Sequence, residues 1–275
     1  MTTDMKDIMS SYQIQEQNTH NEKVDAVIIG GLAFSSLKNF QLNPVNTSFG
    51  KVDVYIGKIF DRNIAVIPRH SGEQNHVPPH RINYRANIQA VYELKAERII
   101  SVNSVGSMKD HIPGSFILFD DFLDFTKHRI STFFDNKTMH VDMSQPYCPQ
   151  IKKRLSESLV CRGLNYFGGV YACTEGPRFE TKAEINMLSH FADFVGMTGV
   201  PEIILAKELD ICYASIGLVT NYACGLSSER LTVDEVMDVV NDSRNLLYDV
   251  ISDTISRLPE NRDCSCMYAT YNARI

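Results

Sequence analysis

Two kinds of hydrophobic pattern alternate along this chain. Short apolar runs bounded by glycine or polar turns predict strands, and segments whose apolar residues recur every three or four positions predict helices. The first run, residues 24–29 (VDAVII), is continuous and stops at Gly30-Gly31, which is typical of a strand buried on both faces. The other predicted strands are residues 52–59, 64–67, 98–102, 116–119, 169–173, 194–196 and 211–219. The predicted helices are residues 82–94, 150–161, 181–191, 201–209 and an amphipathic segment from Val233 to Leu258.

The alternation of strands and helices predicts an α/β fold with a mostly parallel or mixed central β-sheet flanked by helices. The chain contains no internal repeat, low-complexity linker or break in composition, so we expect a single domain over residues 23–259. Residues 1–22 are polar and are expected to form a flexible N-terminal extension. Residues 260–275 are expected to form a polar C-terminal tail that carries Cys264 and Cys266.

Composition and charge exclude several classes of protein. With 44% hydrophobic and 22% charged residues, the chain is typical of a globular protein and not of a disordered one. Its net charge of -6 has the wrong sign for binding nucleic-acid phosphates. The sequence shows neither the apolar core of a signal peptide nor an apolar run long enough for a membrane span, so we expect a cytoplasmic protein with no membrane partner. The 7 cysteines, an odd number scattered over a long chain, favour a reducing compartment.

Polar loops lie next to the ends of three predicted strands. Asn103 and Ser104 follow the strand at 98–102, the segment GMTG at 196–199 follows the next short strand, and TNY at 220–222 follows the strand at 211–219. Proteins of the α/β class bind ligands at the carboxyl ends of their strands. Each loop alone is also consistent with an ordinary turn or helix cap. Together the three loops predict a binding site.

Two further segments are candidates for binding an anion. Gly30-Gly31 is not part of a G-x-G-x-x-G dinucleotide motif, so this turn either presents backbone N–H groups to an anion or is a plain tight turn. Residues 69–85 contain three histidines and three arginines whose spacing matches no standard zinc pattern. This cluster favours an oxyanion site, with a solvated basic loop as the alternative.

Four longer motifs, in this order, carry a resemblance to a known family. They are R-H-S-G-x-x-x-x-V-P-P-H-R-I-N-Y-R-A-N, T-E-G-P-R-F-E-T-x-A-E, G-M-T-G-V-P-E-x-x-L-A-K-E and C-Y-A-S-I-G-L-V-T-N-Y. With them the chain resembles the trimeric purine nucleoside phosphorylases, specifically the branch that acts on 5'-methylthioadenosine or 5'-methylthioinosine. The resemblance implies a homotrimeric pentosyltransferase of purine salvage, with active sites at subunit interfaces. It implies inorganic phosphate as co-substrate and neither a metal nor an organic cofactor in the reaction.

The resemblance also assigns roles to residues of this chain. It implies a phosphate site formed by Gly30, Arg69, His70, Asn103, Ser104 and Thr198. It implies a base and ribose site formed by Phe179, Glu180, Met197 and Asn221. Catalysis would fall to Asn221, Glu180 and His70. The pocket for the 5' group would be formed by Val233, Met237 and, from a neighbouring subunit, His140.

Two positions point to the substrate. Branch members that act on 6-aminopurines are similar in having Asp at the position of Asn221 and again where this chain has Ala223. An amide can donate to O6 and accept from N7–H, so Asn221 favours a 6-oxopurine such as hypoxanthine. Members that take 5'-hydroxyl nucleosides are similar in placing a His where this chain has Val233 and Met237, which predicts an apolar pocket for a methylthio group. A 5'-methylthioadenosine phosphorylase is the alternative within this class.

Two departures from the family bear on this prediction. The family's first loop usually carries a hydroxyl that binds phosphate, but this chain has Leu32-Ala33 there, and Ser71 stands where Gly is commoner. A nucleoside-binding protein with impaired phosphorolysis is therefore the alternative from another class, and hydrolysis without phosphate is a third. Cys264-x-Cys266 resembles a C-terminal pair that forms disulfides in thermophilic members, whereas free thiols are expected in a mesophile's cytosol.

Overall fold

A mixed β-sheet forms the centre of the molecule. The computed structural model describes residues 23–31, 39–71, 76–228 and 230–274, so the predicted extension 1–22 lies outside it. Within these residues the strand order is β10-β9-β8-β11-β7-β1-β6-β5-β2. The strands are β1 (Ala26–Gly30), β2 (Gln41–Leu42), β5 (Tyr55–Ile59), β6 (Arg62–Pro68), β7 (Arg98–Ser107), β8 (Phe116–Phe125), β9 (Tyr166–Thr174), β10 (Phe194–Gly196) and β11 (Cys212–Tyr222). A separate hairpin is formed by β3 (Val45–Thr47) and β4 (Gly50–Val52).

The first strand lies between two parallel neighbours. β1 pairs with β6 on one side and with β7 on the other, and all five of its residues are buried. This confirms that the continuous apolar run belongs to a strand covered on both faces. β5 and β6 form the antiparallel pair that the sequence predicts, while β8 runs antiparallel to β11, so the sheet is mixed.

The sheet closes on itself at one end. The short strand β10 is parallel to β9 and also antiparallel to β7. Since β9 pairs with β8, β8 with β11 and β11 with β7, five strands complete a ring. β10 is therefore hydrogen-bonded along both of its edges, and the polar segment that follows it starts from a fixed position.

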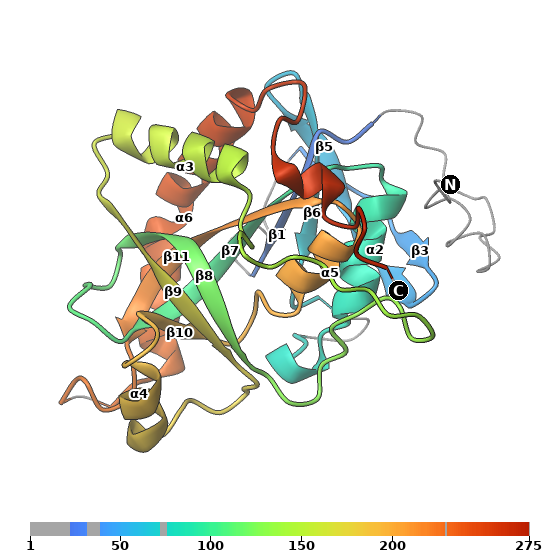
Figure 1. Cartoon of the computed structure of the whole chain (residues 1–275). Helices are drawn as coiled ribbons and strands as arrows, with labels where there is room; N and C mark the ends of the chain where they lie inside the picture. The colour runs from blue at the N-terminus through green and yellow to red at the C-terminus, as the bar shows by residue number, and fades with distance from the viewer. Residues whose placement is uncertain (1–22, 32–38, 72–75, 229, 275) are drawn as a thin grey trace.

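Helices cover both faces of the sheet (Figure 1). On one side α3 (Pro149–Cys161) packs against α6 (Val233–Ser256), and on the other α2 (Tyr84–Glu93) packs against α5 (Glu202–Glu208). The short helix α4 (Lys182–Leu188) packs its apolar side chains against β9 and β10. None of the helices in the described part of the chain is both long enough and apolar enough to cross a membrane. These helices confirm the α/β class predicted from the sequence.

A capping box fixes the start of α6, the helix that covers the candidate site. The Thr232 hydroxyl accepts a hydrogen bond from the Glu235 N–H at 3.3 Å, and the Glu235 carboxylate accepts from the Thr232 N–H at 3.2 Å. Two backbone donors that lack partners within the helix are satisfied in this way. The helix register, and with it the face that α6 turns to the sheet, is set from this point.

The C-terminal tail packs onto the domain. Residues 265–268 form the 3-10 helix η3 (Ser265–Tyr268), and Cys264, Cys266 and Ala273 are buried. The Thr270 hydroxyl donates to the Asp210 carboxylate at 2.7 Å, and its N–H does so at 2.8 Å. A tail expected from its polar composition to be an appendage therefore contributes to the core.

Candidate active site

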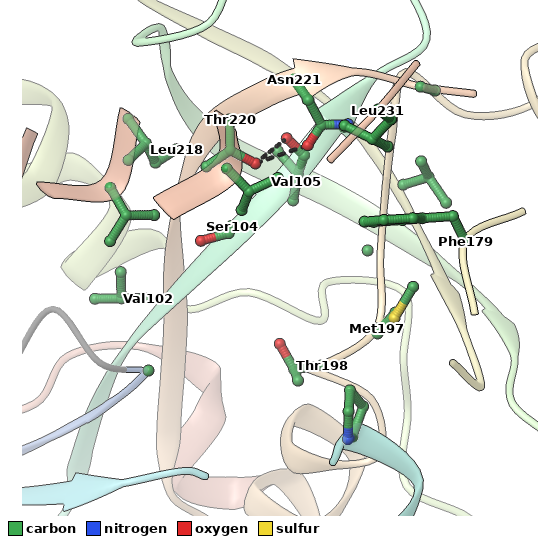
Figure 2. Close-up of a pocket in the computed structure, with 18 of the residues that line it drawn as sticks. Val102, Ser104, Val105, Phe179, Met197, Thr198, Leu218, Thr220, Asn221 and Leu231 are labelled. Carbon is green, nitrogen blue, oxygen red and sulfur yellow. Dashed lines mark hydrogen bonds between the residues drawn. The ribbon is translucent and has the colours of Figure 1, made fainter. Parts of the chain in front are cut away.

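A cavity of about 210 Å³ lies where β7, β10 and β11 end beneath α6 (Figure 2). Its wall brings together the polar loops that the sequence predicts to converge. Among the lining residues are Gly31, Arg69, His70, Ser104, Phe179, Glu180, Met197, Thr198, Asn221, Leu231, Val236, Val240 and Leu247. Thr198 and Asn221 lie at opposite ends of the cavity, with apolar side chains between them (Figure 2). The space is concave and mostly apolar with a few polar groups, as in small-molecule sites.

A bulge in β11 directs Asn221 into the cavity. The register between β11 and β7 pairs Val219 with Val105 and Asn221 with Gly106, so Thr220 is the additional residue. A Cβ atom at Gly106 would come within 3.0 Å of the Asn221 Nδ2 atom, which explains why glycine stands opposite the amide. The Thr220 hydroxyl donates to Asn221 Oδ1 at 2.8 Å and orients the amide.

Thr198 is the best-placed donor at the other end. Its hydroxyl oxygen accepts a hydrogen bond from Asn103 Nδ2 at 2.8 Å, which leaves the hydroxyl hydrogen available to a ligand. Its backbone is held by Tyr171, whose hydroxyl donates to the Thr198 carbonyl and accepts from the Thr198 N–H. A hydroxyl donor fixed in this way suits an oxyanion.

Ser104 and Asn103 have different positions although they are neighbours in β7. Ser104 faces the cavity and is exposed to it. Asn103 is buried and does not line the cavity, because alternate strand residues face opposite sides. Its Oδ1 accepts from the hydroxyls of Ser101 and Ser215, and its amide donates to Thr198. The sequence predicts that Asn103 contacts phosphate, whereas the structure places it behind Thr198 as a supporting residue.

Arg69 lines the cavity, but most of its hydrogen-bond donors are already paired within the protein. Its Nε donates to Glu202 Oε1 at 2.5 Å and its Nη2 to Glu202 Oε2 at 3.0 Å. Nη1 and Nη2 also donate to the Val102 carbonyl and the Ser101 hydroxyl. Burial lowers the Arg69 pKa, but the Glu202 carboxylate more than offsets this and raises it. The guanidinium edge predicted to hold an anion is thus directed at Glu202, and one Nη1 hydrogen is left over by these bonds.

His70 is a neutral imidazole with a defined tautomer. Its Nδ1 lies 2.8 Å from the Val77 carbonyl oxygen, which can only accept, so Nδ1 carries the hydrogen. Burial, together with the charges of Arg69 and His76, lowers the His70 pKa to about 4. His76 stacks on His70 with ring centroids 4.7 Å apart. Nε2 is therefore a hydrogen-bond acceptor at neutral pH. It can accept a hydrogen bond from the P–OH group of a monoprotonated phosphate.

The opposite end of the cavity is suited to a planar ring. Phe179 and Met197 lie on the same side of it, below Asn221 in Figure 2. Gly176 has φ +65°, and a Cβ there would meet the Met197 sulfur at 2.7 Å, so glycine lets Met197 approach. Glu180 Oε1 accepts from the Thr174 hydroxyl at 2.6 Å, which leaves Oε2 for a ring N–H.

The apolar part of the wall comes from different residues of α6 than the sequence predicts. Val236, Val240 and Leu247 line the cavity, because positions four and seven apart share one face of a helix. Met237 is turned about 100° away from Val236 and is absent from the wall. Val233, in the first helical turn, is 64% exposed. The cavity has an apolar wall under α6, and neither Val233 nor Met237 is among its lining residues.

Two other predicted residues, Gly30 and His140, are not among the residues that line the cavity. Gly30 ends β1 and accepts the Arg69 N–H at 2.8 Å, while its neighbour Gly31 lines the cavity. His140 is exposed, and its N–H donates to the Ala273 carbonyl of the tail at 2.7 Å. Leu32-Ala33, at the departure from the family's first loop, lie outside the described residues.

Sequence reasoning missed two residues that hold the site together. Glu202 is completely buried beside Arg69, and its place in the motif G-M-T-G-V-P-E was the signal for it. Arg129 donates to the carbonyls of Thr174, Glu175, Met197 and Val200 and so ties together the two segments that carry the base site. Its four carbonyl contacts are with backbone atoms, which leave no pattern in the sequence.

Comparisons with known proteins agree on the kind of fold and site. The family model for the phosphorylase superfamily matches residues 25–256. A protein of Methanosarcina acetivorans named "Probable S-methyl-5'-thioinosine phosphorylase" is 53% identical over 252 residues, 92% of this chain and 97% of its own. The "6-oxopurine nucleoside phosphorylase" of Pyrococcus furiosus is 42% identical over 90% of this chain and 97% of its own. A methylthioadenosine phosphorylase from an antarctic soil metagenomic library superposes with TM-score 0.84 at 28% identity, covering 92% of this chain and 93% of its own.

The low pKa of His70 predicts a pH-dependent stability. Between pH 6.5, the ordinary histidine value, and about 4, the unfolded chain binds a proton that the folded chain does not, so stability falls as pH is lowered. In urea unfolding without phosphate, the unfolding free energy of the wild type is expected to fall more steeply over this window than that of His70→Asn, by up to about 1.4 kcal/mol per pH unit. Parallel pH profiles for the two proteins would contradict this.

Proposed function

The chain belongs to the phosphorylase superfamily, and we propose that it cleaves 5'-methylthioinosine with inorganic phosphate. The products are hypoxanthine and 5-methylthioribose 1-phosphate. The observation that carries this proposal is the division of the cavity: hydroxyl and imidazole groups at the Thr198 end, an amide and a carboxylate at the Asn221 end, and an apolar wall from α6. The names of the relatives above, given for S-methyl-5'-thioinosine and 6-oxopurine nucleosides, support the same substrate class.

The reaction follows from the arrangement of the two ends. Phosphate at Thr198, Ser104 and His70 would place an oxygen at C1' of the nucleoside. A new C1'–O bond forms as the C1'–N9 bond breaks, and the bonding electrons move into the purine ring. A proton from water at N7 then completes neutral hypoxanthine. The positive charge that develops on the ribose is stabilised by the phosphate itself.

The base edge explains the preference for a 6-oxopurine. Asn221 Nδ2 can donate to O6, and this bond strengthens as negative charge moves into the ring; once N7 is protonated, Oδ1 can accept from N7–H. The free oxygen of Glu180 can accept from N1–H, a hydrogen that adenine lacks. The site thereby discriminates through two half-buried polar groups that only the correct base pairs.

The wall from α6 explains the preference at the 5' position. Apolar side chains line this part of the cavity: Leu231, just before α6, and Val236, Val240 and Leu247 within it. A methylthio group is buried favourably there, at about 0.8 kcal/mol per CH₂-sized unit, whereas a hydroxyl would lose its hydrogen bond to water.

The homotrimer implied by the family resemblance is part of this proposal. His140 is exposed and lies outside the cavity wall of its own chain. A contact between His140 and the 5' group therefore requires a second copy of the chain, in agreement with active sites at subunit interfaces.

Base release tests the proposed reaction directly. We expect the purified chain to release hypoxanthine from 5'-methylthioinosine only when phosphate is present, and to do so with a higher kcat/KM than it releases adenine from 5'-methylthioadenosine. Release at the same rate without phosphate would indicate hydrolysis. Binding of the nucleoside with no release at any phosphate concentration would indicate a nucleoside-binding protein instead.

Substitution of Asn221 tests the base edge. Asn221→Asp replaces the donor to O6 with an acceptor suited to the 6-amino group. We expect the ratio of kcat/KM for methylthioinosine over methylthioadenosine to fall by at least about tenfold, the effect of one charge-assisted hydrogen bond. Asn221→Leu, similar in size, is the control: it should weaken both reactions without moving the preference towards adenine. An unchanged ratio in Asn221→Asp would refute the role of this residue.

A pair of isosteric substitutions tests the 5' pocket. Val236→Thr adds a hydroxyl to the cavity wall, so the ratio of kcat/KM for methylthioinosine over inosine is expected to fall by roughly tenfold. Val233→Thr makes the same chemical change at a position that faces solvent and should leave the ratio unchanged. Equal effects of the two substitutions would show that α6 presents a different face to the substrate.

A further inference from the structure

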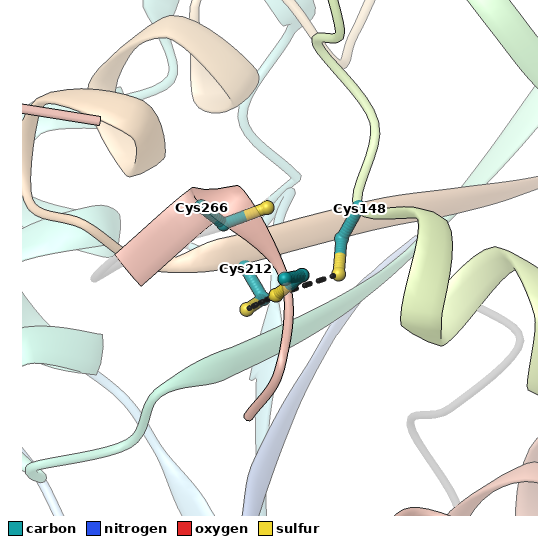
Figure 3. Close-up of side chains that lie close together, drawn as sticks. Cys148, Cys212 and Cys266 are labelled. Carbon is teal, nitrogen blue, oxygen red and sulfur yellow. Dashed lines mark hydrogen bonds between the residues drawn. The ribbon is translucent and has the colours of Figure 1, made fainter. Parts of the chain in front are cut away.

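Four buried cysteines meet near the start of β11, whereas the cavity lies where β11 ends. Cys148 precedes α3, Cys212 begins β11, and Cys264 and Cys266 belong to the tail (Figure 3). Their sulfur atoms all lie within 4.8 Å of one another. None of the four lines the candidate active site, and each packs in the core cluster covered by α3 and α6.

The sulfur separations agree with a single tetrahedral ion. The Sγ atoms of Cys148 and Cys264 are 3.6 Å apart, and those of Cys212 and Cys264 are 3.3 Å apart. Four sulfurs each about 2.3 Å from a zinc ion at the centre of a tetrahedron lie about 3.8 Å from one another. All four sulfurs are free thiols, so a complete set of ligands is present.

A nearby cation suits the charge of such a site. Four thiolates around a divalent ion carry a net charge of two minus. Arg262 Nη1 lies 4.0 Å from the Cys212 sulfur, while the same nitrogen donates to the Asp210 carbonyl at 2.6 Å. The Arg262 side chain is 13% exposed and also pairs with Glu97 at 3.2 Å, so its charge is shared between Glu97 and the sulfur site. Charge-compensating groups next to the ligands are a regular part of metal sites.

Ordinary core packing does not explain this convergence. A buried cysteine is a small hydrophobe and needs no sulfur partner. Cys173 behaves in this way, because it is buried and stands outside the set of mutually close sulfurs. By contrast, the sulfur atoms of the other four cysteines lie close together, although these residues belong to three separate segments of the chain. Soft thiolate ligands in a tetrahedral set are typical of zinc and of iron–sulfur sites, and a single ion at the centre of four sulfurs is the usual structural zinc site.

We propose that Cys148, Cys212, Cys264 and Cys266 bind a structural zinc ion. Each thiol releases its hydrogen to solvent on binding, so the ion is held by four thiolates. Because all four coordination positions are filled by the protein, no position is open to substrate, and the ion has no part in the reaction.

The ion would fasten the tail to the domain. Two ligands come from the tail and two from elements of the α/β core. After these two ligands, the Thr270 hydroxyl of the tail donates to the Asp210 carboxylate. The Met139–Arg274 β-bridge and the hydrogen bond from the His140 N–H to the Ala273 carbonyl attach the tail to the segment that carries His140. Zinc would thus set the position of His140 from a distance, through the tail.

Metal content tests this proposal in the full-length chain. Elemental analysis of protein purified without chelator is expected to give about one zinc per chain. The double variant Cys264→Ser/Cys266→Ser should lose the zinc, while Cys161→Ser/Cys224→Ser, which changes the same number of thiols elsewhere, should retain it. If the first variant does not fold, titration of the wild type with a mercurial reagent decides the question, since zinc should be released in step with the reaction of four thiols.

Hydrogen exchange provides the structural measurement. Removal of zinc from the wild type should speed amide exchange in residues 262–274 and in residues 139–140 while leaving β1 protected. The proposal is overturned if the protein contains no zinc, if it contains iron instead, or if peptide mapping without reduction finds disulfides among the four cysteines. Exchange in the tail that does not change when zinc is removed would overturn the fastening role.

Discussion

The buried ion pair between Arg69 and Glu202 is the constraint around which the site is built. The two side chains are 2% and 0% exposed, and Tyr213 also donates to the carboxylate. Through the carbonyls of Ile29 and Val102 the guanidinium ties together β1, β6 and β7, while Glu202 joins them to α5. Burial of two charges is tolerable only because nearly every donor and acceptor is satisfied, and removal of one partner from such a pair costs about 3–5 kcal/mol.

This constraint determines how an anion can be held. With its charge largely balanced by Glu202, Arg69 does not act as an isolated phosphate clamp. The Thr198 hydroxyl, oriented by Asn103, and the neutral His70 ring supply directed hydrogen bonds instead. Phosphate binding then depends on the geometry of the strand ends as much as on positive charge.

The sequence was sufficient to predict most elements, for a reason that the structure makes clear. Both faces of β1 are buried, so its apolar run is unbroken, and α6 shows a clear amphipathic stripe. Prediction was poorer where burial changes along a strand. The predicted strand 116–119 stops at Phe119, whereas β8 continues to Phe125. The second half of β8 is partly exposed and partly polar, so it lacks the apolar run that predicts a buried strand. The short strands β2 and β3 carry too few apolar residues to show a period.

The site was predictable to the extent that a residue stands in a motif and faces the ligand. Phe179, Met197 and Asn221 stand in the quoted motifs and line the cavity, whereas Ser104 lines it from the polar loop predicted after residues 98–102. Asn103 is next to Ser104 in the sequence, but its side chain points away from the cavity. The face of α6 that lines the cavity could not be predicted without knowing where the first turn of the helix begins. Arg129 joins the two segments through backbone carbonyls and so could not be found from side-chain patterns.

The closed ring of strands gives the cavity two walls of different construction. β10, bonded on both edges, anchors Met197 and Thr198, and this wall has no free edge along which to shift. The opposite wall is reached through residues 225–228, which are exposed, and through the first turns of α6. A nucleoside that enters the cavity would pass this exposed side. Evolution of a new 5' specificity therefore has the freedom to reshape one wall while the chemistry stays fixed on the other.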